Sequence, residues 1–304
     1  MTQPPRIAIF TTSEGTHREA FTPSHWALVA FNGLVFGSAF LWMALGLRSL
    51  TPGVIAFGRV ALGAGALALF ARSRSPVARG DWSRIAFLGV VGQAAPAWLF
   101  AAAEERIASA VAGMLVSGIP IATATVAALL MRRLPGMRQR IGLAVGFSGI
   151  VLLSIPTLGG EVGSALGIAY VLTAVVCYGV ANNLLVPLQQ RYGAMAVTLR
   201  TLSVASVALI PIGFTGLARS SFEWVPVLAV VILGVVGTGV ARATQLALAG
   251  RVGASRGSVV AYLVPIVALV LGFLVLAERV EPIQLIGVVV TIGGAYLVSR
   301  AERT

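Results

Sequence analysis

Three arginines stand inside long apolar stretches of the sequence, where a charged group needs a specific reason. They are Arg59, Arg200 and Arg242. A charge at the centre of a bilayer costs between roughly 2.5 and more than 10 kcal/mol. Arg200 and Arg242 lie toward the ends of their stretches, from which a long side chain can reach lipid headgroups or line a cavity. Arg59 lies about 12 Å from the nearer edge at 1.5 Å per residue. We therefore expect Arg59 to point inward, where it either bonds polar protein groups or attracts a carboxylate or phosphate.

Uncharged polar residues also recur inside apolar stretches, and we expect them to line a cavity or to bond between helices. Asn182 and Asn183 are adjacent, so their side chains point about 100° apart on a helix and one at most can face a cavity squarely. The candidate substrate-cavity residues are Asn32, Ser38, Arg59, Gln93, Trp98, Tyr178, Asn182, Thr238, Arg242, Gln245 and Tyr262.

Other reactive residue types are scarce. All 22 basic residues are arginine, which excludes a P-loop lysine and a Schiff base. His17 and His25 precede the first apolar stretch, so no histidine is left there for zinc, for a Ser–His pair or for a proton relay. Cys177 is the single cysteine. We predict no enzyme activity, no metal site and no cofactor. Because the apolar stretches contain no Asp or Glu, a cavity among them favours neutral, zwitterionic or anionic solutes over cations.

The elements that position these residues follow from composition. The chain has 304 residues, of which 58% are hydrophobic and 11% charged, whereas a soluble domain has about a quarter charged. Crossing a bilayer takes about 20 apolar residues. The sequence predicts an all-α integral membrane protein with ten transmembrane helices, at 26–47, 52–71, 85–103, 108–131, 141–156, 165–187, 196–217, 226–247, 257–277 and 283–299. Residues 1–25 are polar and contain Pro4 and Pro5, which indicates a flexible tail.

The distribution of arginine predicts the orientation. With the termini placed inside, the outer connections hold only Arg48, Arg106, Arg219 and Arg279, while most other arginines fall inside. The positive-inside rule therefore predicts cytoplasmic tails at 1–25 and 300–304 in a multi-pass protein of the cytoplasmic membrane. The same asymmetry explains the net charge of +12, because most arginines lie on the inner side of the lipid bilayer. We therefore expect no nucleic acid as a partner.

The sequence contains an internal repeat. Leu88–Gly92 (LGVVG) recurs as Leu233–Gly237 (LGVVG), a shift of 145, and the same shift maps Pro120 onto Pro265. Phe36-Gly37 matches Tyr178-Gly179 earlier in each half. This predicts two five-helix repeats, 26–156 and 165–299. Because five is odd, the second repeat enters the membrane inverted, which places a substrate site between the halves and allows alternating access.

These marks together resemble the EamA-type carriers of the drug/metabolite transporter superfamily. The resemblance covers about residues 26–300 and rests on the aromatic–glycine pairs, Arg59, the two prolines, and Glu278 followed by Gly287 and Gly293-Gly294. It implies ten helices, cytoplasmic termini, a central cavity and transport of amino acids or other small metabolites, often as export. The sequence departs from the family in having Phe36 where tryptophan is frequent, and Arg133 at the position that matches Glu278.

The sequence therefore predicts a secondary transporter of small metabolites, amino acids or related compounds, that works by alternating access. Its partners are a small-molecule substrate and the lipid bilayer. Pro120 and Pro265 break the backbone ladder in mid-helix and are the expected kink or gate positions. The alternative that the sequence leaves open is a flippase of lipid or of lipid-linked sugar with the same fold.

Overall fold

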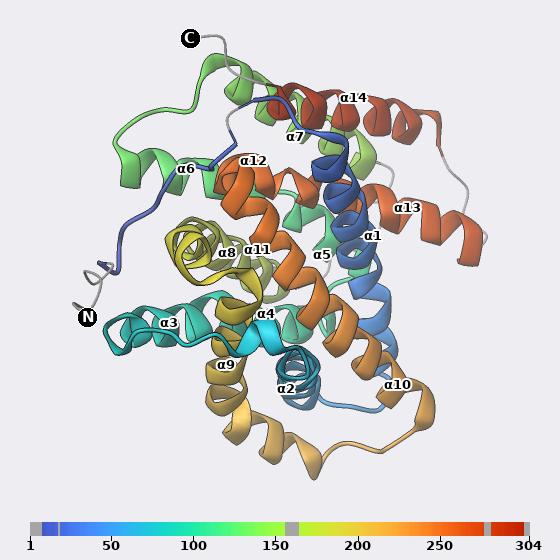
Figure 1. Ribbon diagram of the computed structural model, residues 1–304. Coiled ribbons are helices and arrows are strands. Elements are labelled where there is room, and N and C mark those ends of the chain that lie inside the picture. Colours follow the sequence, from blue (N-terminus) through green and yellow to red (C-terminus); the bar gives the residue numbers. More distant parts are fainter. Residues whose placement is uncertain (1–7, 18, 156–163, 277–280, 301–304) are drawn as a thin grey trace.

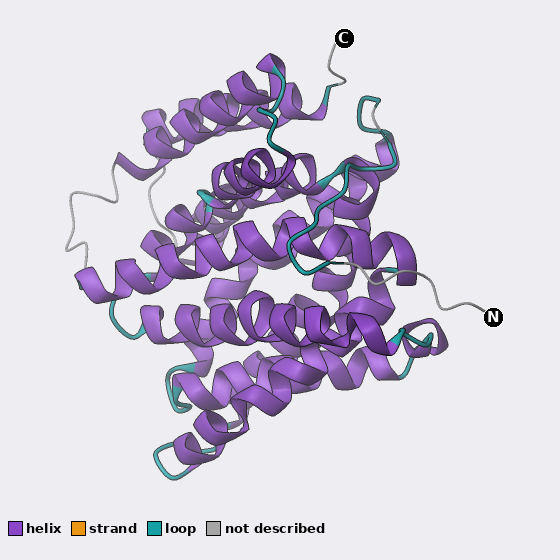
Figure 2. Cartoon of the chain, turned by 90° about the vertical axis from the view of Figure 1, so that its left-hand side faces the viewer, coloured by secondary structure: helices purple, strands orange, loops and turns teal. Residues whose placement is uncertain are grey.

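A computed structural model describes residues 8–17, 19–155, 164–276 and 281–300. Within these ranges every regular element is a helix (Figure 1, Figure 2). Glu278, Arg279 and the predicted tail residues 1–7, 18 and 301–304 lie outside them. The first half contains α1 (Pro23–Gly46), α2 (Pro52–Ala68), η1 (Ala71–Arg74), η2 (Arg79–Asp81), α3 (Trp82–Gly89), η3 (Val90–Ala94), α4 (Ala95–Glu104), α5 (Ser109–Val116), α6 (Ile119–Met131) and α7 (Met137–Ser154). The second contains α8 (Ala165–Tyr192), α9 (Ala194–Leu217), α10 (Trp224–Ile232), η5 (Leu233–Val240), α11 (Ala241–Val252), α12 (Ala254–Gly257), η6 (Ser258–Tyr262), α13 (Leu263–Leu276) and α14 (Pro282–Ser299).

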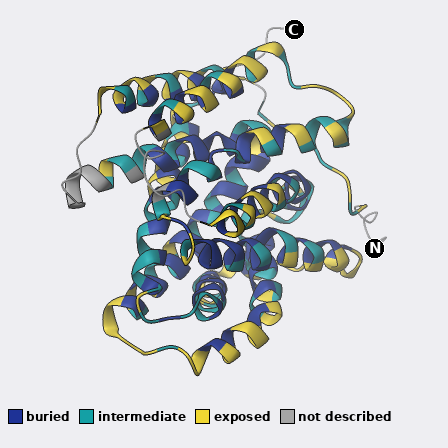
Figure 3. Ribbon diagram, turned by 180° about the vertical axis from the view of Figure 1, so that it is seen from behind, coloured by how far each residue is buried: buried dark blue, intermediate teal, exposed yellow. Residues whose placement is uncertain are grey.

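Each of the ten predicted membrane spans corresponds to one of these helices or to a run of consecutive ones. Among the described residues, eight helical segments are long and apolar enough to cross a membrane, and α2, with 17 residues, is a shorter apolar helix. Helix α7 has 18 residues but carries Arg138 and Arg140 in its first turn. Large apolar side chains such as Leu166, Val207 and Val289 are exposed, as expected for helices that face lipid. Figure 3 shows how exposed and buried residues are distributed along the helices.

The two halves share their irregularities as well as their helices. The third span of each half is interrupted by a π-helical segment, η3 in the first half and η5 in the second. Adding the repeat shift of 145 to η3 gives residues 235–239, which lie within η5. The fourth span of each half is likewise broken, by a turn at Ser117-Gly118 and by the 3₁₀ segment η6. The structure therefore repeats the duplication that the sequence predicts.

Contacts between the halves are also paired. A methyl group on Gly37 of α1 would lie 2.5 Å from Cβ of Val267 in α13, and one on Gly179 of α8 would lie 3.0 Å from Cβ of Ala122 in α6. Gly37 and Gly179 are the repeat-related glycines of the two aromatic–glycine pairs, and Ala122 and Val267 are related by the shift of 145. Each aromatic–glycine helix thus packs on the proline-bearing helix of the opposite half.

Helices α7 and α14, which end the two halves, lie side by side at the top of Figure 1. Gly142 contacts Val298 and Gly294, whereas Gly149 contacts Thr291 and Gly287, so the two helices run antiparallel. Gly142 and Gly287 are related by the shift of 145, as are Gly149 and Gly294. Gly142 therefore contacts the repeat partner of Gly149, and Gly149 contacts the repeat partner of Gly142. This reciprocal pattern is the one expected for a two-fold axis between inverted repeats.

The prediction of a flexible N-terminal tail is wrong for the described part of that tail. Residues 8–17 and 19–22, here called the N-terminal strap, precede α1 as a dark-blue trace in Figure 1. The amide of Thr16 donates to the carbonyl of Gly250, that of His17 to Arg251, and that of Phe21 to Ser299. The polar composition suggested that this segment would be exposed to solvent. Its partners are backbone groups and arginines of the helices, and the sequence of the strap itself carries no signal of these partners.

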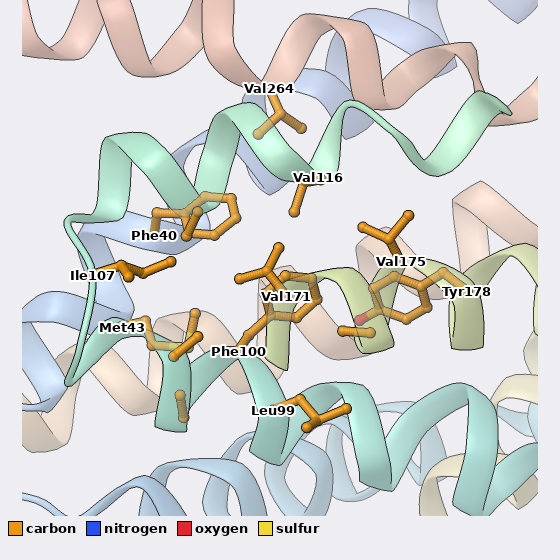
Figure 4. Close-up of a cluster of buried hydrophobic side chains, with 14 of the residues drawn as sticks. Phe40, Met43, Leu99, Phe100, Ile107, Val116, Val171, Val175, Tyr178 and Val264 are labelled. Carbon is orange, nitrogen blue, oxygen red and sulfur yellow. The ribbon is translucent and has the colours of Figure 1, made fainter. Parts of the chain in front are cut away.

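The largest buried apolar cluster lies between the halves (Figure 4). Phe40 and Met43 of α1 meet Phe100 of α4, and the ring of Phe100 stacks on Tyr178 of α8 with centroids 5.8 Å apart. Phe40 packs edge-on against Phe100 with centroids 6.1 Å apart. These aromatic contacts fix the wall of the cavity described next.

Candidate functional site

A central cavity lies where the two halves meet, with about 670 Å³ of space not filled by atoms. Its walls come from both halves and from the middle of α1 and α8. The lining residues are Phe36, Ala39, Phe40, Met43, Arg59, Phe100, Val116, Ile119, Tyr178, Asn182, Arg242, Gln245, Ser258, Val260, Ala261 and Val264.

Arg242 of α11 lies against two aromatic faces of the cavity. Its guanidinium carbon is 4.1 Å from the ring centroid of Tyr178 and 5.5 Å from that of Phe36. Phe36 and Tyr178 are the aromatic members of the two repeated pairs, so the motif from each half supplies one ring. Cation–π contact stabilises a guanidinium that has left water. The arginine therefore lines the cavity and does not reach toward headgroups.

Arg59 of α2 is buried and also lines the cavity. Its Nε donates to the hydroxyl of Thr238 at 3.0 Å, and Nη1 lies 3.9 Å from the sulfur of Met43. Thr238 belongs to the π segment η5, and its hydroxyl donates in turn to the carbonyl of Leu233. The inward orientation expected for Arg59 is therefore present, and one of its partners is a polar side chain of the other half.

Two amides complete the polar part of the cavity. The Nε2 group of Gln245 donates to the carbonyl of Gly257 at 3.0 Å, while its buried Oε1 has no hydrogen-bond donor among the described residues. Asn182 lines the cavity and donates to the hydroxyl of Thr123 at 3.3 Å. Asn183 turns away and donates to the carbonyls of Thr123 and Gly179. Only one of the two adjacent asparagines thus faces the cavity.

A second, smaller cavity adjoins the first, with about 390 Å³ of empty space. Tyr178, Asn182, Arg242 and Gln245 line both, so these four residues form the wall between the two spaces. Gln93 lines the second cavity, whose further lining residues are Gly92, Ala181, Leu185, Thr198, Leu246 and Ala249.

Several predicted site residues lie elsewhere. Asn32 is fully buried and accepts from the hydroxyl of Thr244 while donating to the carbonyl of Leu28, so it joins α1 to α11. Ser38 donates to the carbonyl of Val35 in its own helix. The hydroxyl of Tyr262 donates to the carbonyl of Leu143 at 2.8 Å.

Trp98 and Thr238 also lie outside the central lining. Trp98 packs on Tyr170 with ring centroids 5.5 Å apart and lines a separate peripheral cavity. The hydroxyl of Thr238 accepts a hydrogen bond from Nε of Arg59 and so helps to hold that side chain in place. Of the eleven predicted cavity residues, the structure thus brings together five in the central lining: Arg59, Tyr178, Asn182, Arg242 and Gln245.

Arg200 has a structural role. Its Nη1 donates to the carbonyls of Ser73 and Ala196 at 2.9 Å, and its Nη2 donates to that of Ser75 at 2.5 Å. These bonds fasten the connection after α2 to α9. The guanidinium therefore finds its partners in the protein and does not need lipid headgroups.

The prolines lie at helix starts and not in mid-helix. Pro120 occupies the first turn of α6, just after the break at Ser117-Gly118, and Pro265 is the third residue of α13, just after η6. Proline has no amide N–H, and the first turn of a helix leaves such donors unpaired in any case, so proline fits there without loss. The break in each span therefore precedes the proline.

Sequence reasoning missed most of the apolar wall, including Phe40, Met43, Phe100 and Val116. Their residue types are those of any buried or lipid-facing helix, so no signal marked them. It also placed Glu104 in an outer connection, whereas Glu104 is the last residue of α4 and accepts from the hydroxyl of Ser109 at 3.0 Å. Within the described ranges, no group of three His, Cys, Asp or Glu side chains could hold a metal ion.

Comparison with known proteins assigns this architecture. The profile of the EamA-like transporter family matches residues 24–155 and 165–300. A protein named "Probable terminal-alkyne amino-acid exporter" from Streptantibioticus cattleyicolor is 28% identical over 281 residues, covering 90% of this chain and 93% of that protein. An "Uncharacterized transporter" of Archaeoglobus fulgidus is 24% identical over 275 residues, covering 90% of this chain and 98% of that protein.

A solved crystal structure superposes with a TM-score of 0.69 at 17% identity, covering 91% of this chain and 96% of that one, which shows a shared fold. The family match covers both halves, and its two copies correspond to the duplicated, all-helical architecture described above. The family consists of multi-pass membrane transporters and not of enzymes. The chain belongs to the EamA-like transporter family.

Proposed function

We propose that this protein is a secondary transporter that moves small metabolites across the cytoplasmic membrane by alternating access, with both termini cytoplasmic. The observation that carries the proposal is the central cavity between two halves that pack with two-fold symmetry. If the halves exchange slightly different shapes, the same cavity opens first to one side and then to the other.

The name of one relative supports a class of substrate. One of them carries the name of an amino-acid exporter, and this chain matches it over nearly its whole length. We therefore extend the proposal to export of amino acids or related compounds. The distribution of arginine supports the orientation, because the connections on the side of the termini hold most of these residues.

The test is transport by purified protein. Metabolites are first screened by the rise in melting temperature that binding produces, and the best hits are then assayed by counterflow in liposomes. Ala39→Phe places a bulky ring in the cavity wall and should abolish counterflow. Ala30→Phe adds the same ring at an exposed position of the same helix and is the matched control.

Counterflow that survives Ala39→Phe in correctly folded protein would place the pathway elsewhere and refute the proposal. Equal loss in both variants would also count against it, because the effect would then not be specific to the cavity.

A further inference from the structure

We propose that the substrate of the central cavity is a small monocarboxylate with an apolar side group and a neutral N–H, such as an N-acylated amino acid, and not a free zwitterion. The proposal deepens the proposed function and rests on it. It is carried by the unequal use of charged groups in the cavity.

Arg242 has unused hydrogen-bonding capacity. A guanidinium carries five N–H donors, yet no acceptor among the described residues is bonded to Arg242, whose contacts are the rings of Tyr178 and Phe36. By contrast, Arg84 and Arg200 direct donors to backbone carbonyls. A partly buried guanidinium with free donors is complementary to a carboxylate, which it can bind through two parallel hydrogen bonds.

The local charge balance leaves room for one anion. Arg59 already has partners within the protein, since its Nε donates to Thr238 and its Nη1 lies against the sulfur of Met43. Arg242 has no acid beside it in the cavity lining. One carboxylate would neutralise it. A zwitterion would add an ammonium to a space that already holds two guanidiniums and no lining carboxylate.

Gln245 supplies a neutral acceptor. Its Oε1 is buried and has no donor within the described part of the chain. Leaving a buried acceptor unpaired is unfavourable, so a ligand N–H that reaches it is stabilised. Because Gln245 and Arg242 line the same wall, one ligand can meet both through a carboxylate and a nearby amide N–H.

The rest of the lining is apolar. Phe36, Phe40 and Phe100 supply aromatic surface, and Val116 and Val264 supply aliphatic surface. A ligand with a carboxylate at one end therefore gains by burying an aromatic or branched side group at the other.

Three probes that share one side chain test the charge class: N-acetyl-L-phenylalanine, L-phenylalanine and L-phenylalaninamide. They present an anion with a neutral N–H, a zwitterion and a cation. Binding to purified protein and counterflow in liposomes at neutral pH are measured for each. We expect N-acetyl-L-phenylalanine to bind at least tenfold tighter than L-phenylalanine, and L-phenylalaninamide to bind weakest.

Arg242→Gln should weaken binding of the acetylated probe at least tenfold and should reduce discrimination against the amide. Arg48→Gln removes one positive charge from an exposed connection and is the control. Binding of L-phenylalanine equal to or tighter than that of its acetyl derivative would overturn the substrate class while leaving transport intact. Absence of binding by all three probes would also overturn the class, and the metabolite screen would still test transport.

A separate observation supports a second proposal. We infer that the N-terminal strap locks one end of the bundle and that its release is needed for the cavity to open there. The strap crosses several helices of both halves. The Thr12 hydroxyl donates to the carbonyl of Asn183 in α8, and the Ser13 hydroxyl donates to Oε1 of Gln190 in the same helix. The amide of Thr16 donates to Gly250 of α11.

Two arginines of the helices, buried Arg84 and half-buried Arg256, donate hydrogen bonds to carbonyls of the strap. Arg84 of α3 is fully buried and donates to the carbonyls of Ala8 and Thr11 as well as to Leu184 of α8. Arg256 of α12 donates to the carbonyls of His17, Glu19 and Ser299. The strap carbonyls therefore accept hydrogen bonds from two arginines that are also bonded to helix carbonyls, which ties the strap to the helices.

The strap is bonded to α8 and α11, the two helices that supply most of the lining of the second cavity. Asn183, Leu184 and Gly250, which bond the strap or share Arg84 with it, are sequence neighbours of Asn182, Leu185 and Ala249, which line that cavity. Opening this end of the bundle requires α8 and α11 to separate, and the strap is bonded to both.

A reversible crosslink tests the lock. Ser13→Cys and Gln190→Cys are combined with Cys177→Ala, so that a short bis-methanethiosulfonate reagent joins only the strap and α8. We expect crosslinking to reduce counterflow at least tenfold and a reductant to restore it. The two single-cysteine proteins, treated alike, should keep their activity. Undiminished counterflow in protein shown by mass spectrometry to be crosslinked would overturn the lock, as would a loss that the reductant does not reverse.

Discussion

Gly146 of α7 and Gly294 of α14 meet backbone to backbone. A methyl group added to Gly294 would overlap the amide of Gly146 and lie 2.7 Å from the carbonyl oxygen of Gly142. Such close approach of two helices needs small residues, because any larger one pushes the backbones apart. The contact belongs to the antiparallel pair that relates the halves.

Adjacent glycines at this contact should therefore respond in opposite ways. Gly294→Ala should destabilise the protein by about 1–3 kcal/mol through overpacking. A methyl group on Gly293 meets nothing within 4 Å. Gly293→Ala should be neutral or stabilise by up to about 1 kcal/mol, because alanine is the better helix former. Thermal unfolding in detergent compares the two, and equal effects would contradict the packing described.

The bond between Arg59 and Thr238 should contribute to stability. Thr238→Val keeps the shape but leaves the buried Nε of Arg59 without its acceptor, which should cost about 1–3 kcal/mol. Thr238→Ser keeps the hydroxyl and should retain most of the stability. The melting temperatures of the two variants check this, and a valine variant as stable as the serine variant would show that the bond is not needed.

Arg200 should affect folding and not selectivity. Arg200→Met keeps an unbranched apolar stem but loses the guanidinium and its three bonds to carbonyls, so the melting temperature should fall. The variant should bind N-acetyl-L-phenylalanine and L-phenylalanine with the same ratio of affinities as the unmodified protein, because Arg200 does not line the central cavity. A changed ratio would assign Arg200 a role at the substrate site.

Loss of Arg84 should release the strap. In Arg84→Leu the carbonyls of Ala8 and Thr11 lose their donor, so amide hydrogen exchange at residues 8–17 should rise at least tenfold. Arg48→Leu, at an exposed connection, should leave exchange in the strap unchanged. Slow exchange in the Arg84 variant would mean that other contacts hold the strap.

Labelling from outside the cell should distinguish equivalent positions of the two repeats. Arg106 and Arg251 are related by the shift of 145 and both are exposed. In a Cys177→Ala background, Arg106→Cys should react with an impermeant maleimide in intact cells, and Arg251→Cys only after permeabilisation. Labelling of both from the same side would refute the inverted orientation.

The sequence was sufficient to predict the spans and the register of the repeat. Pro120 and Pro265, the paired glycines and the apolar runs are local signals with a fixed spacing, and all recur in the structure. The proline spacing could not show that the break comes before the proline, because that depends on how the first turn of the next helix is satisfied. The π segments left no pattern either, since they differ from α-helix in hydrogen bonding and not in composition.

The site was only partly predictable for a similar reason. Asn32, Gln93 and Arg242 are all polar residues in apolar runs, and the sequence gives no means of ranking them. What separates them is the partner: Thr244 for Asn32, and the rings of Tyr178 and Phe36 for Arg242. Those partners lie far away in the chain, so their pairing follows from tertiary packing alone.

The glycine-lined pairing of α7 with α14 has a mechanical consequence. Where two backbones lie this close, either helix can rock about the line of contact, but sliding along it would drive carbonyls and Cα atoms into one another. We therefore expect the pair to act as a pivot. The motion that opens the central cavity to one face of the membrane and then to the other should rotate about this helix pair. The helices farthest from the pair should then move the most.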